Sequence, residues 1–249
     1  MEKFIFGLRP VIEAIKAGKE IDRIMLKRDM TGANAPELLQ LIRDNGIVLQ
    51  RVPVEKLNRL TRGNHQGVVA FLSAVSYYKV EDLVPSLYDN GDVPLLVILD
   101  GITDVRNFGA IARTCECAGV DAIVIPERGS VSVGADAVKT SAGALLTLPV
   151  CREKNLAKTV KYLKESGFTV VAASEKAVEN YTKVDYTVPT AIIMGNEETG
   201  ITSQLLRECT SLVAIPQFGD IQSLNVSVAA GVMIYEAVRQ RLNDGMRLE

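Results

Sequence analysis

Three apolar runs of the sequence each end in glycines and small polar side chains. The runs span residues 95–99, 191–194 and 212–215. If these runs are strands of an open parallel sheet, ligands bind beyond their carboxyl ends. The residues that follow the three runs should therefore lie close together. Amide, carboxylate, hydroxyl and guanidinium groups at such an edge can orient a substrate and move a proton. The side chains that could do this chemistry are Asn107, Arg113, Glu197, Ser223 and Asn225.

The glycines beside these residues let a ligand approach the backbone, which suits a nucleoside-containing cofactor. Common nucleotide motifs are absent. The spacing of Gly195 and Gly200 matches a P-loop and Thr202 fits its Ser or Thr position, but Ile201 stands where that loop needs Lys. No GxGxxG opens a helix after a strand, which argues against a Rossmann-type oxidoreductase. His65 is the only histidine, so a histidine-based triad is unsupported, and no carboxylate cluster indicates a metal site.

Each candidate also has a structural interpretation that the sequence leaves open. Asn107 could simply cap the helix that we predict over residues 107–118. Ser223 and Asn225 could cap the last helix in the same way. Arg113 could be a surface charge, and Glu197 could be a solvated loop carboxylate. The functional hypothesis therefore depends on the coincidence of polar residues behind three separate strands.

The residues from 95 onward alternate between strand and helix patterns. Continuous apolar runs predict strands that are covered on both faces. Such alternation predicts a mostly parallel sheet wrapped by helices. The predicted strands are 95–99, 122–125, 168–173, 191–194 and 212–215, and the predicted helices are 107–118, 156–166 and 224–242.

A smaller α/β unit precedes this alternation. Periodicity predicts helices over 4–18, 36–45 and 54–62, and strands over 21–26, 47–52 and 68–72. The stretch 76–93 is less regular and reads as a linker with a helical turn or two. We therefore predict a domain at 1–75, a linker at 76–93 and a catalytic domain at 94–249.

The charge distribution differs between the two parts of the chain. Residues 1–75 hold 12 Lys and Arg against 8 Asp and Glu, whereas the remainder holds 16 against 22. A basic front part suggests contact with a polyanion. The stretch from Arg51 to His65 is a candidate for RNA binding there. The alternative for this stretch is a solvated surface, and the alternative for His65 is a structural role in a turn. The candidate RNA-binding residues are Arg9, Arg51, Arg59, Arg62 and His65.

Composition and cysteine usage indicate an ordinary globular protein. The chain is 47% hydrophobic and 23% charged, and no apolar run approaches the roughly 18 residues that cross a bilayer. We expect a cytoplasmic protein. The spacing of the cysteines is not that of a zinc site, so free buried thiols are expected. These cysteines are Cys115, Cys117, Cys151 and Cys209.

The three strand-end blocks resemble the SpoU/TrmH family of RNA 2′-O-methyltransferases in the SPOUT superfamily. The first block runs from Leu99-Asp-Gly through Asn107-Phe-Gly to Arg113. The second is Met194-Gly-Asn-Glu with Gly200-Ile, and the third is Ile215-Pro followed by Ser223-Leu-Asn-Val-Ser. At the front, Phe6-Gly-Leu-Arg-Pro-Val and His65-Gln-Gly-Val resemble the substrate-binding domain of a subgroup that methylates a guanosine of 23S ribosomal RNA.

The resemblance implies a fold and partners that spacing alone does not. It implies an α/β sheet whose C-terminal part forms a deep trefoil knot, preceded by a small domain like ribosomal protein L30e. General topology rules would argue against a knot. It also implies a homodimer with the last helix in its interface, and a role in rRNA processing on naked RNA or a pre-ribosomal particle. The cofactor would be S-adenosylmethionine, bound by Gly195, Asn196, Gly200, Ile215 and Leu224.

The roles that the resemblance suggests for Arg113 and Glu197 can be weighed chemically. The family picture gives Arg113 a central role, sometimes as general base. Arginine stays protonated, so its fork is better suited to gripping a phosphate. Glu197 is the easier proton acceptor. The alternatives are a methyltransferase for transfer RNA or another rRNA site, and a non-catalytic RNA-binding or ribosome-assembly factor.

Overall fold

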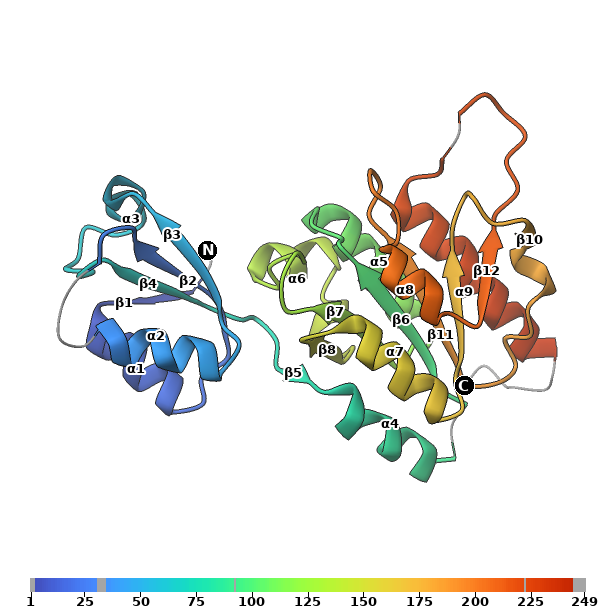
Figure 1. The fold of residues 1–249 in the computed structure, drawn as a ribbon, viewed down its shortest axis with the longest axis horizontal. Helices are drawn as coiled ribbons and strands as arrows, with labels where there is room; N and C mark the ends of the chain where they lie inside the picture. Colours follow the sequence, from blue (N-terminus) through green and yellow to red (C-terminus); the bar gives the residue numbers. More distant parts are fainter. Residues whose placement is uncertain (1–2, 31–34, 92, 222, 244–249) are drawn as a thin grey trace. The chain divides into compact units, whose positions relative to one another are not determined.

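The computed structural model describes residues 3–30, 35–91, 93–221 and 223–243. Contacts divide the chain into two compact units. Unit 1 comprises residues 1–76 with 132–136, and unit 2 comprises residues 77–131 with 137–249. Each unit contains a sheet of its own (Figure 1).

Unit 1 is a four-stranded mixed sheet with helices on both faces. Its strand order is β1-β4-β2-β3, with β2 parallel to β3 and antiparallel to β4. The strands are β1 (Phe4–Phe6), β2 (Ile21–Lys27), β3 (Val48–Val52) and β4 (Val68–Leu72), and the helices are α1 (Leu8–Lys16), α2 (Ala35–Asp44) and α3 (Val54–Leu60).

The two faces of this sheet follow the period of two that strands impose on side chains. Ile24 and Val68 pack against α1 and α2, whereas Met25 and Val69 pack with Leu57 of α3 on the other face. The predicted strand over 68–72 is confirmed, and the other elements of this unit agree within a few residues.

The first predicted helix is wrong at its start. Residues 4–6 form strand β1, which pairs antiparallel with β4, and the helix begins only at Leu8. Gly7 separates the two elements with a φ of 94°, a conformation that side-chain-bearing residues rarely adopt. The apolar Phe4 and Phe6 suit a strand face as well as a helix stripe, so periodicity alone could not place this boundary.

Unit 2 is built on an eight-stranded sheet in which all the pairs are parallel. Its order is β10-β12-β9-β11-β6-β7-β8-β5. The strands are β5 (Tyr77–Tyr78), β6 (Leu95–Asp100), β7 (Ala122–Pro126), β8 (Val150–Glu153), β9 (Thr169–Ala173), β10 (Glu179–Asn180), β11 (Thr190–Gly195) and β12 (Ser211–Ala214). The helices along this part of the chain are α4 (Val80–Asp89), α5 (Val105–Cys117), α6 (Ala135–Thr140), α7 (Leu156–Glu165), α8 (Ser203–Glu208) and α9 (Val226–Asn243).

Two layers of helices enclose this sheet. On one face, Leu96 and Ile98 of β6 share a core with α4, α7 and α8. On the other face, α5 packs against α9, and α9 packs against β11 (Figure 1). The mostly parallel sheet that the alternation predicted is confirmed. The segment 76–93 forms β5 and α4 within unit 2, and α4 is longer than the turn or two expected there.

Helix α9 is held along its length by its buried stripe and at its end by a buried cation. The predicted stripe of Val226, Ala230, Met233 and Ala237 is buried. Arg241 is only 6% exposed. Its guanidinium donates hydrogen bonds to four main-chain carbonyls, which satisfies the polar hydrogens that burial would otherwise leave unpaired. These carbonyls belong to Val93, Pro94, Tyr186 and Val188.

Within the described residues, no helix is both long enough and apolar enough to span a bilayer.

Candidate active site

Four neighbouring strands of unit 2 end at one edge of the sheet. The order β12-β9-β11-β6 places the ends of these parallel strands side by side. The loops that leave them begin at Ala214, Ala173, Gly195 and Asp100. This edge is where ligands of open parallel sheets bind, and it is where the polar residues of all three sequence blocks lie.

Three of the predicted catalytic residues form one hydrogen-bonded cluster, which we name the strand-end network. The side-chain amide of Asn107 donates to Glu197 Oε1 at 3.1 Å. The amide of Asn225 donates to the same Oε1 at 2.7 Å and to Asn107 Oδ1 at 3.0 Å. The backbone N–H of Val226 also reaches Glu197 Oε1, at 3.3 Å. One carboxylate oxygen thus joins segments that lie 90 and 28 residues away in the sequence.

Asn107 is free for this network because another residue caps its helix. The alternative interpretation of Asn107 as the cap of α5 is excluded, since the helix begins at Val105 and its N-cap is Asp104. Asp104 accepts hydrogen bonds from the backbone N–H groups of Arg106 and Asn107. These bonds to the charged carboxylate, foremost that from Arg106, lower the pKa of Asp104.

Asn225 acts both as a cap and as a network member. Its Oδ1 accepts from the backbone N–H of Ser227 at 2.9 Å, in the first turn of α9. Its amide group points to Glu197 and Asn107 instead. The two interpretations that the sequence left open for Asn225 therefore coexist in one side chain.

The loop after β11 is held closed by Asn196 and Asp100. Asn196 and Gly200 bond each other through their backbones, and the side chain of Asn196 donates to the carbonyl of Gly101 at 2.8 Å. Asp100, only 8% exposed, accepts from the backbone N–H of Thr202 at 2.7 Å. The positions of Glu197 and the loop backbone thus depend on contacts with the end of β6.

Gly195 has to be a glycine because its own loop fills the space where a side chain would begin. A Cβ built there would lie 2.4 Å from both the backbone carbon of Gly200 and the nitrogen of Ile201. Such distances are far inside van der Waals contact, so any side chain would displace the loop.

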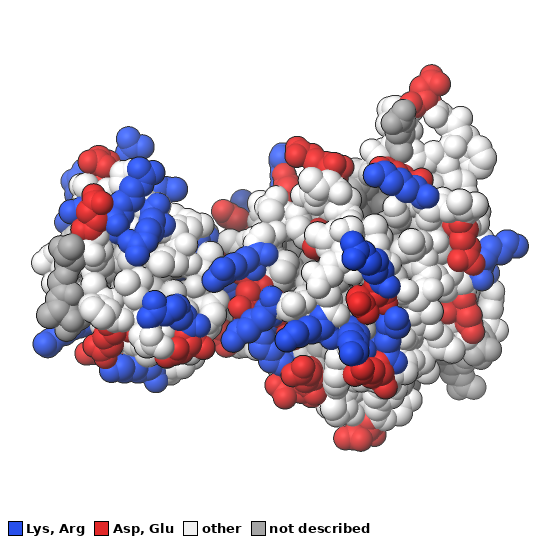
Figure 2. Space-filling view, viewed as in Figure 1, with Lys and Arg blue, Asp and Glu red and all other residues white. Residues whose placement is uncertain are grey.

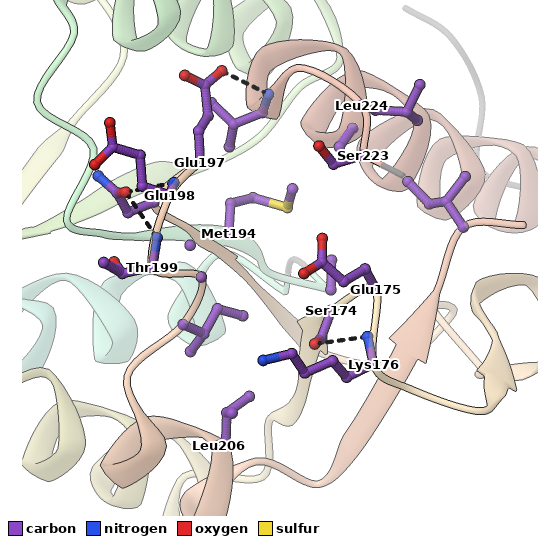
Figure 3. Close-up of a pocket in the computed structure, with 18 of the residues that line it drawn as sticks. Ser174, Glu175, Lys176, Met194, Glu197, Glu198, Thr199, Leu206, Ser223 and Leu224 are labelled. Atoms are coloured by element: carbon purple, nitrogen blue, oxygen red, sulfur yellow. Dashed lines mark hydrogen bonds between the residues drawn. The ribbon is translucent and has the colours of Figure 1, made fainter. Parts of the chain in front are cut away.

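A hollow opens between these loops, and Figure 3 shows it in close-up. Ser174, Glu175 and Lys176 reach it from the end of β9, whereas Ser223 and Leu224 face them from the segment before α9. The sulfur of Met194 lies between the two sides. All five residues predicted to bind a cofactor line this hollow, namely Gly195, Asn196, Gly200, Ile215 and Leu224.

Sequence reasoning missed the contribution of the segment after β9. Ser174, Glu175 and Lys176 line the hollow, and Lys176 donates its backbone N–H to the hydroxyl of Ser174. A signal was available, because these polar residues directly follow the predicted strand 168–173. The strand 168–173 was not among the three strands predicted to end at the site, so these residues were not predicted to line it.

The lining of the hollow suits a ligand that carries positive charge and a flat apolar part. Three carboxylates, those of Glu175, Glu197 and Glu198, line it against one ammonium group, that of Lys176. Met194, Ile215 and Leu224 supply apolar walls. A sulfonium cofactor with an attached adenosine has these properties. Within the described ranges, no three His, Cys, Asp or Glu side chains are grouped so that they could hold a metal ion.

Arg113 and Ser223 lie outside the strand-end network. Arg113 is exposed on α5, six residues beyond Asn107, which places it about 9 Å further along the helix and about 120° around its axis. Ser223 lines the hollow. Among the described residues, neither the Arg113 side chain nor the Ser223 side chain takes part in the hydrogen bonds of the network.

The cysteines are free thiols, but they are not all buried. Cys115 and Cys151 are buried, whereas Cys117 is exposed and Cys209 is half-buried, which corrects the expectation for these two. Burial raises the pKa of Cys115, raises that of Cys151 to about 12 and raises that of Cys209 to about 11. These three thiols therefore stay protonated at neutral pH and are poor nucleophiles.

In unit 1, the predicted RNA-binding arginines are exposed. Arg9 lies at the start of α1, and Arg59 and Arg62 lie at and beyond the end of α3. Arg51 donates to the carbonyl of Arg28 at 3.0 Å. Figure 2 shows Lys and Arg side chains gathered over α3 and β3.

His65 differs from these arginines because it is buried, with an exposed fraction of 8%. Its Nε2 lies 2.8 Å from Asn58 Oδ1, and its Nδ1 accepts from the backbone N–H of Gly67 at 3.0 Å. Both ring nitrogens are thus engaged within unit 1. These contacts are those of a turn residue, the alternative that the sequence left open for His65.

Family models match both parts of the chain. Residues 94–235 match the SpoU rRNA Methylase family, and residues 4–78 match the description "RNA 2'-O ribose methyltransferase substrate binding". A Bacillus subtilis protein, YacO, named as a TrmH family tRNA/rRNA methyltransferase, is 34% identical over 238 residues, which cover 96% of each chain.

Solved structures give the same match. An AdoMet-bound rRNA methyltransferase from Sinorhizobium meliloti is 28% identical with a TM-score of 0.60, over 95% of this chain and 86% of that one. The SpoU methyltransferase AviRb from Streptomyces viridochromogenes, in complex with AdoMet, is 25% identical with a TM-score of 0.61, over 97% of this chain and 91% of that one.

Proposed function

Because the chain belongs to the SpoU rRNA methylase family, we propose that it transfers a methyl group to a ribose 2′-hydroxyl of RNA. The cofactor is S-adenosylmethionine, which the solved relatives hold. The single observation that supports this chemistry is the strand-end network beside the hollow. It joins Asn107, Glu197 and Asn225 through one carboxylate oxygen at the mouth of a site with the charge for a sulfonium.

The bound cofactor supplies a methyl group on a positively charged sulfur. The carbon–sulfur bond breaks as the bond to the 2′-oxygen forms, the sulfur leaves as a neutral thioether, and the hydroxyl proton passes to the protein. What the chain contributes is alignment of the oxygen, carbon and sulfur, which alone can supply several kcal/mol of the barrier. Asn107 and Asn225 provide that alignment because each is fixed by hydrogen bonds at both ends of its amide.

Glu197 is the proton acceptor in this proposal. Its Oε1 is occupied by three N–H donors, which fix the orientation of the carboxylate. The second oxygen, Oε2, is the one that would accept the hydroxyl proton. A carboxylate is the chemically suitable base here, since arginine side chains are not deprotonated in proteins.

Arg113 in turn would grip an RNA phosphate beside the target ribose. Its guanidinium is exposed and offers a planar fork of donors that matches a phosphate. Arg113→Lys keeps the charge and loses the fork, so we expect turnover to fall at least tenfold while cofactor affinity stays unchanged. Near-normal turnover of this variant, measured with saturating RNA, would rule out bidentate gripping.

The target in this proposal is a guanosine of 23S ribosomal RNA. The match of residues 4–78 to a substrate-binding model supports an RNA substrate. The resemblance of the front blocks to the subgroup that acts on 23S ribosomal RNA favours a ribosomal target over transfer RNA. We propose that the protein acts in the cytoplasm, where it would bind this RNA. Mapping 2′-O-methyl marks in ribosomal and transfer RNA, with and without the protein, tests this assignment.

The outcomes of that mapping separate the alternatives. Loss of one 23S mark without the protein supports the proposal, and loss of a transfer-RNA mark would move the target. If no mark changes and purified protein transfers no labelled methyl, the chain is a non-catalytic RNA-binding factor. The presence of the complete strand-end network argues against this last alternative.

We also propose that the protein is a homodimer through α9. Val228, Tyr235 and Leu242 are exposed by 53%, 51% and 38%, and a spacing of seven places them along one side of the helix. An exposed apolar stripe opposite a buried one is typical of an interface. Tyr235→Lys should shift the sedimentation of the protein to that of a monomer, and an unchanged dimer would contradict this interface. The trefoil knot implied by the resemblance stays a prediction.

A further inference from the structure

We propose that the outer face of α7 binds the phosphate backbone of the RNA substrate, an inference that rests on the proposed function. Four lysines, Lys154, Lys158, Lys161 and Lys164, lie on or directly before this helix, and we call them the lysine face. At 100° per residue the three within the helix, Lys158, Lys161 and Lys164, fall within about 120° of one another around its axis, and Lys154 precedes the N-cap Asn155. The buried side, with Leu156, Thr159, Val160 and Leu163, lies opposite them.

The lysine face stands out against the acidic character of the rest of unit 2. Residues 76–249 carry an excess of Asp and Glu, yet the segment 154–165 holds four lysines and one glutamate. Figure 2 shows basic side chains, with acidic ones among them, on the part of unit 2 where Figure 1 places α7. A local cationic surface can attract a polyanion even though the unit as a whole carries an excess of negative charge.

These lysines are available to a ligand. All four are exposed. Among the described side chains, Lys161 alone of the four has a carboxylate partner, Glu165 at 3.8 Å, and such an exposed pair contributes little stability. The charges of Lys154, Lys158 and Lys164 are therefore not neutralised within the chain.

The position of α7 links its outer face to the active-site edge. β8 runs parallel to its neighbour β7 and ends at Glu153. Lys154 follows directly, at the sheet edge where the hollow opens, and α7 then runs back along the sheet for about 15 Å. Since α5 and α9 cover the other face of the sheet, an RNA strand whose ribose reaches the strand-end network would cross this edge to reach the lysine face.

Lysine is the appropriate residue for such a track. Its ammonium group is a point charge on a flexible stem, which tolerates any sequence and any exact placement of a phosphate. The lysine face would therefore add affinity without base specificity, and its contribution would fall with rising salt.

The experiment compares Lys158→Glu, Lys164→Glu and the double variant with Lys183→Glu. Lys183 is an exposed lysine of unit 2 in the short helix Tyr181–Lys183, away from α7, so it matches each single charge reversal. RNA binding is measured by filter retention from low to moderate salt. We expect the double variant to bind RNA at least tenfold more weakly at low salt, with a salt slope smaller by about 2.

Two further measurements separate this inference from the proposed function. Cofactor binding by calorimetry and turnover at saturating RNA should stay at wild-type values in the double variant, with only the KM for RNA raised. Wild-type RNA affinity and salt slope in both single variants and the double variant would overturn the lysine face. Wild-type protein that binds RNA but transfers no methyl group would overturn the proposed function and leave the lysine face standing.

A membrane surface is the competing polyanion. If vesicles of anionic phospholipid bind the wild-type protein and lose it on Lys158→Glu/Lys164→Glu, while RNA affinity is equal in both, the face serves a membrane and the inference is wrong.

Discussion

The strand-end network of unit 2 and the basic stretch of unit 1 present polar side chains in opposite ways. In the network, Glu197 receives three hydrogen bonds from residues far away in the sequence. In the basic stretch, Arg59 and Arg62 extend freely from the end of one short helix. The network has a defined geometry that a single substitution can destroy, whereas the stretch has a charge that several residues share.

This difference matches the physical demands of the two tasks. An in-line methyl transfer tolerates little displacement, because an error near 1 Å can cost about a hundredfold in rate. Phosphate binding depends on the number of cations close to the backbone and on salt, so its geometry can stay loose. Substitutions should therefore affect rate sharply in one region and affinity gradually in the other.

The largest expected effect is that of Glu197→Gln. The amide keeps an oxygen for the donors of the network but cannot take a proton, so kcat should fall about a hundredfold or more. Cofactor affinity, measured by calorimetry, should stay within about threefold. The matched control is Glu81→Gln, an exposed residue of α4 that does not line the hollow, which should retain wild-type turnover. Full activity of Glu197→Gln across the pH range would remove Glu197 as the base.

Gly195→Ala should have the next largest effect. The added methyl group would overlap the backbone of Gly200 and Ile201, so the loop must move. Overpacking of this kind costs about 1–3 kcal/mol of unfolding free energy, and cofactor affinity should drop at least tenfold. Gly219→Ala is the control, since nothing lies within 4 Å of a Cβ at that position. Equal cofactor affinity in the two variants would mean that the loop conformation does not set the site.

Replacing both Arg59 and Arg62 with alanine should have a smaller and salt-dependent effect. We expect RNA to bind several-fold more weakly, with a salt slope reduced by about 2, while S-adenosylmethionine binds as before. Lys16→Ala/Arg43→Ala removes the same charge from exposed positions on α1 and α2. If both double variants weaken RNA equally, the basic stretch has no special role and only the net charge of unit 1 matters.

The smallest expected effect concerns the cap of α5. Asp104→Ala should lower the unfolding free energy by about 0.5–2 kcal/mol, whereas Asp104→Asn keeps the capping oxygen and should lose less. The folded-state pKa of Asp104 lies below its unfolded value, so its charge stabilises the fold above about pH 4, and this stability disappears as the pH falls through the folded pKa. Thermal denaturation at pH 7 and pH 3 should show the wild-type advantage over Asp104→Asn shrinking in acid. An advantage that grows in acid would contradict the capping role.

Much of the architecture followed from patterns along the chain. The apolar runs at 95–99 and 191–194 predicted β6 and β11, because a strand buried on both faces has few alternatives in composition. The apolar stripe of α9 was equally clear. The predicted starts of helices were wrong where one residue sets the boundary, as Gly7 does before α1. They were also wrong where two residues could cap the same helix, as Asp104 and Asn107 could for α5.

The composition of the site was only partly visible in the sequence. Glycines and polar residues after apolar runs identified Asn107, Glu197 and Asn225, since parallel strands bring their ends to one edge. The contribution of Glu175 and Lys176 was missed, because the predicted strand before them, 168–173, was not among the three strands expected to end at the site. Arg113 was predicted as a site residue from the first sequence block. Its separation from the network depends on its position along and around α5.

The sequence by itself determined most of the long strands and helices and the chemical groups at three strand ends, because these depend on periodicity and residue type. The tertiary structure alone decided that Glu197 Oε1 would gather Asn107, Asn225 and the first turn of α9, and that Asn196 would bind Gly101. Such contacts join residues between 28 and 95 positions apart. Their geometry is set by the packing of whole strands and helices, which no local pattern encodes.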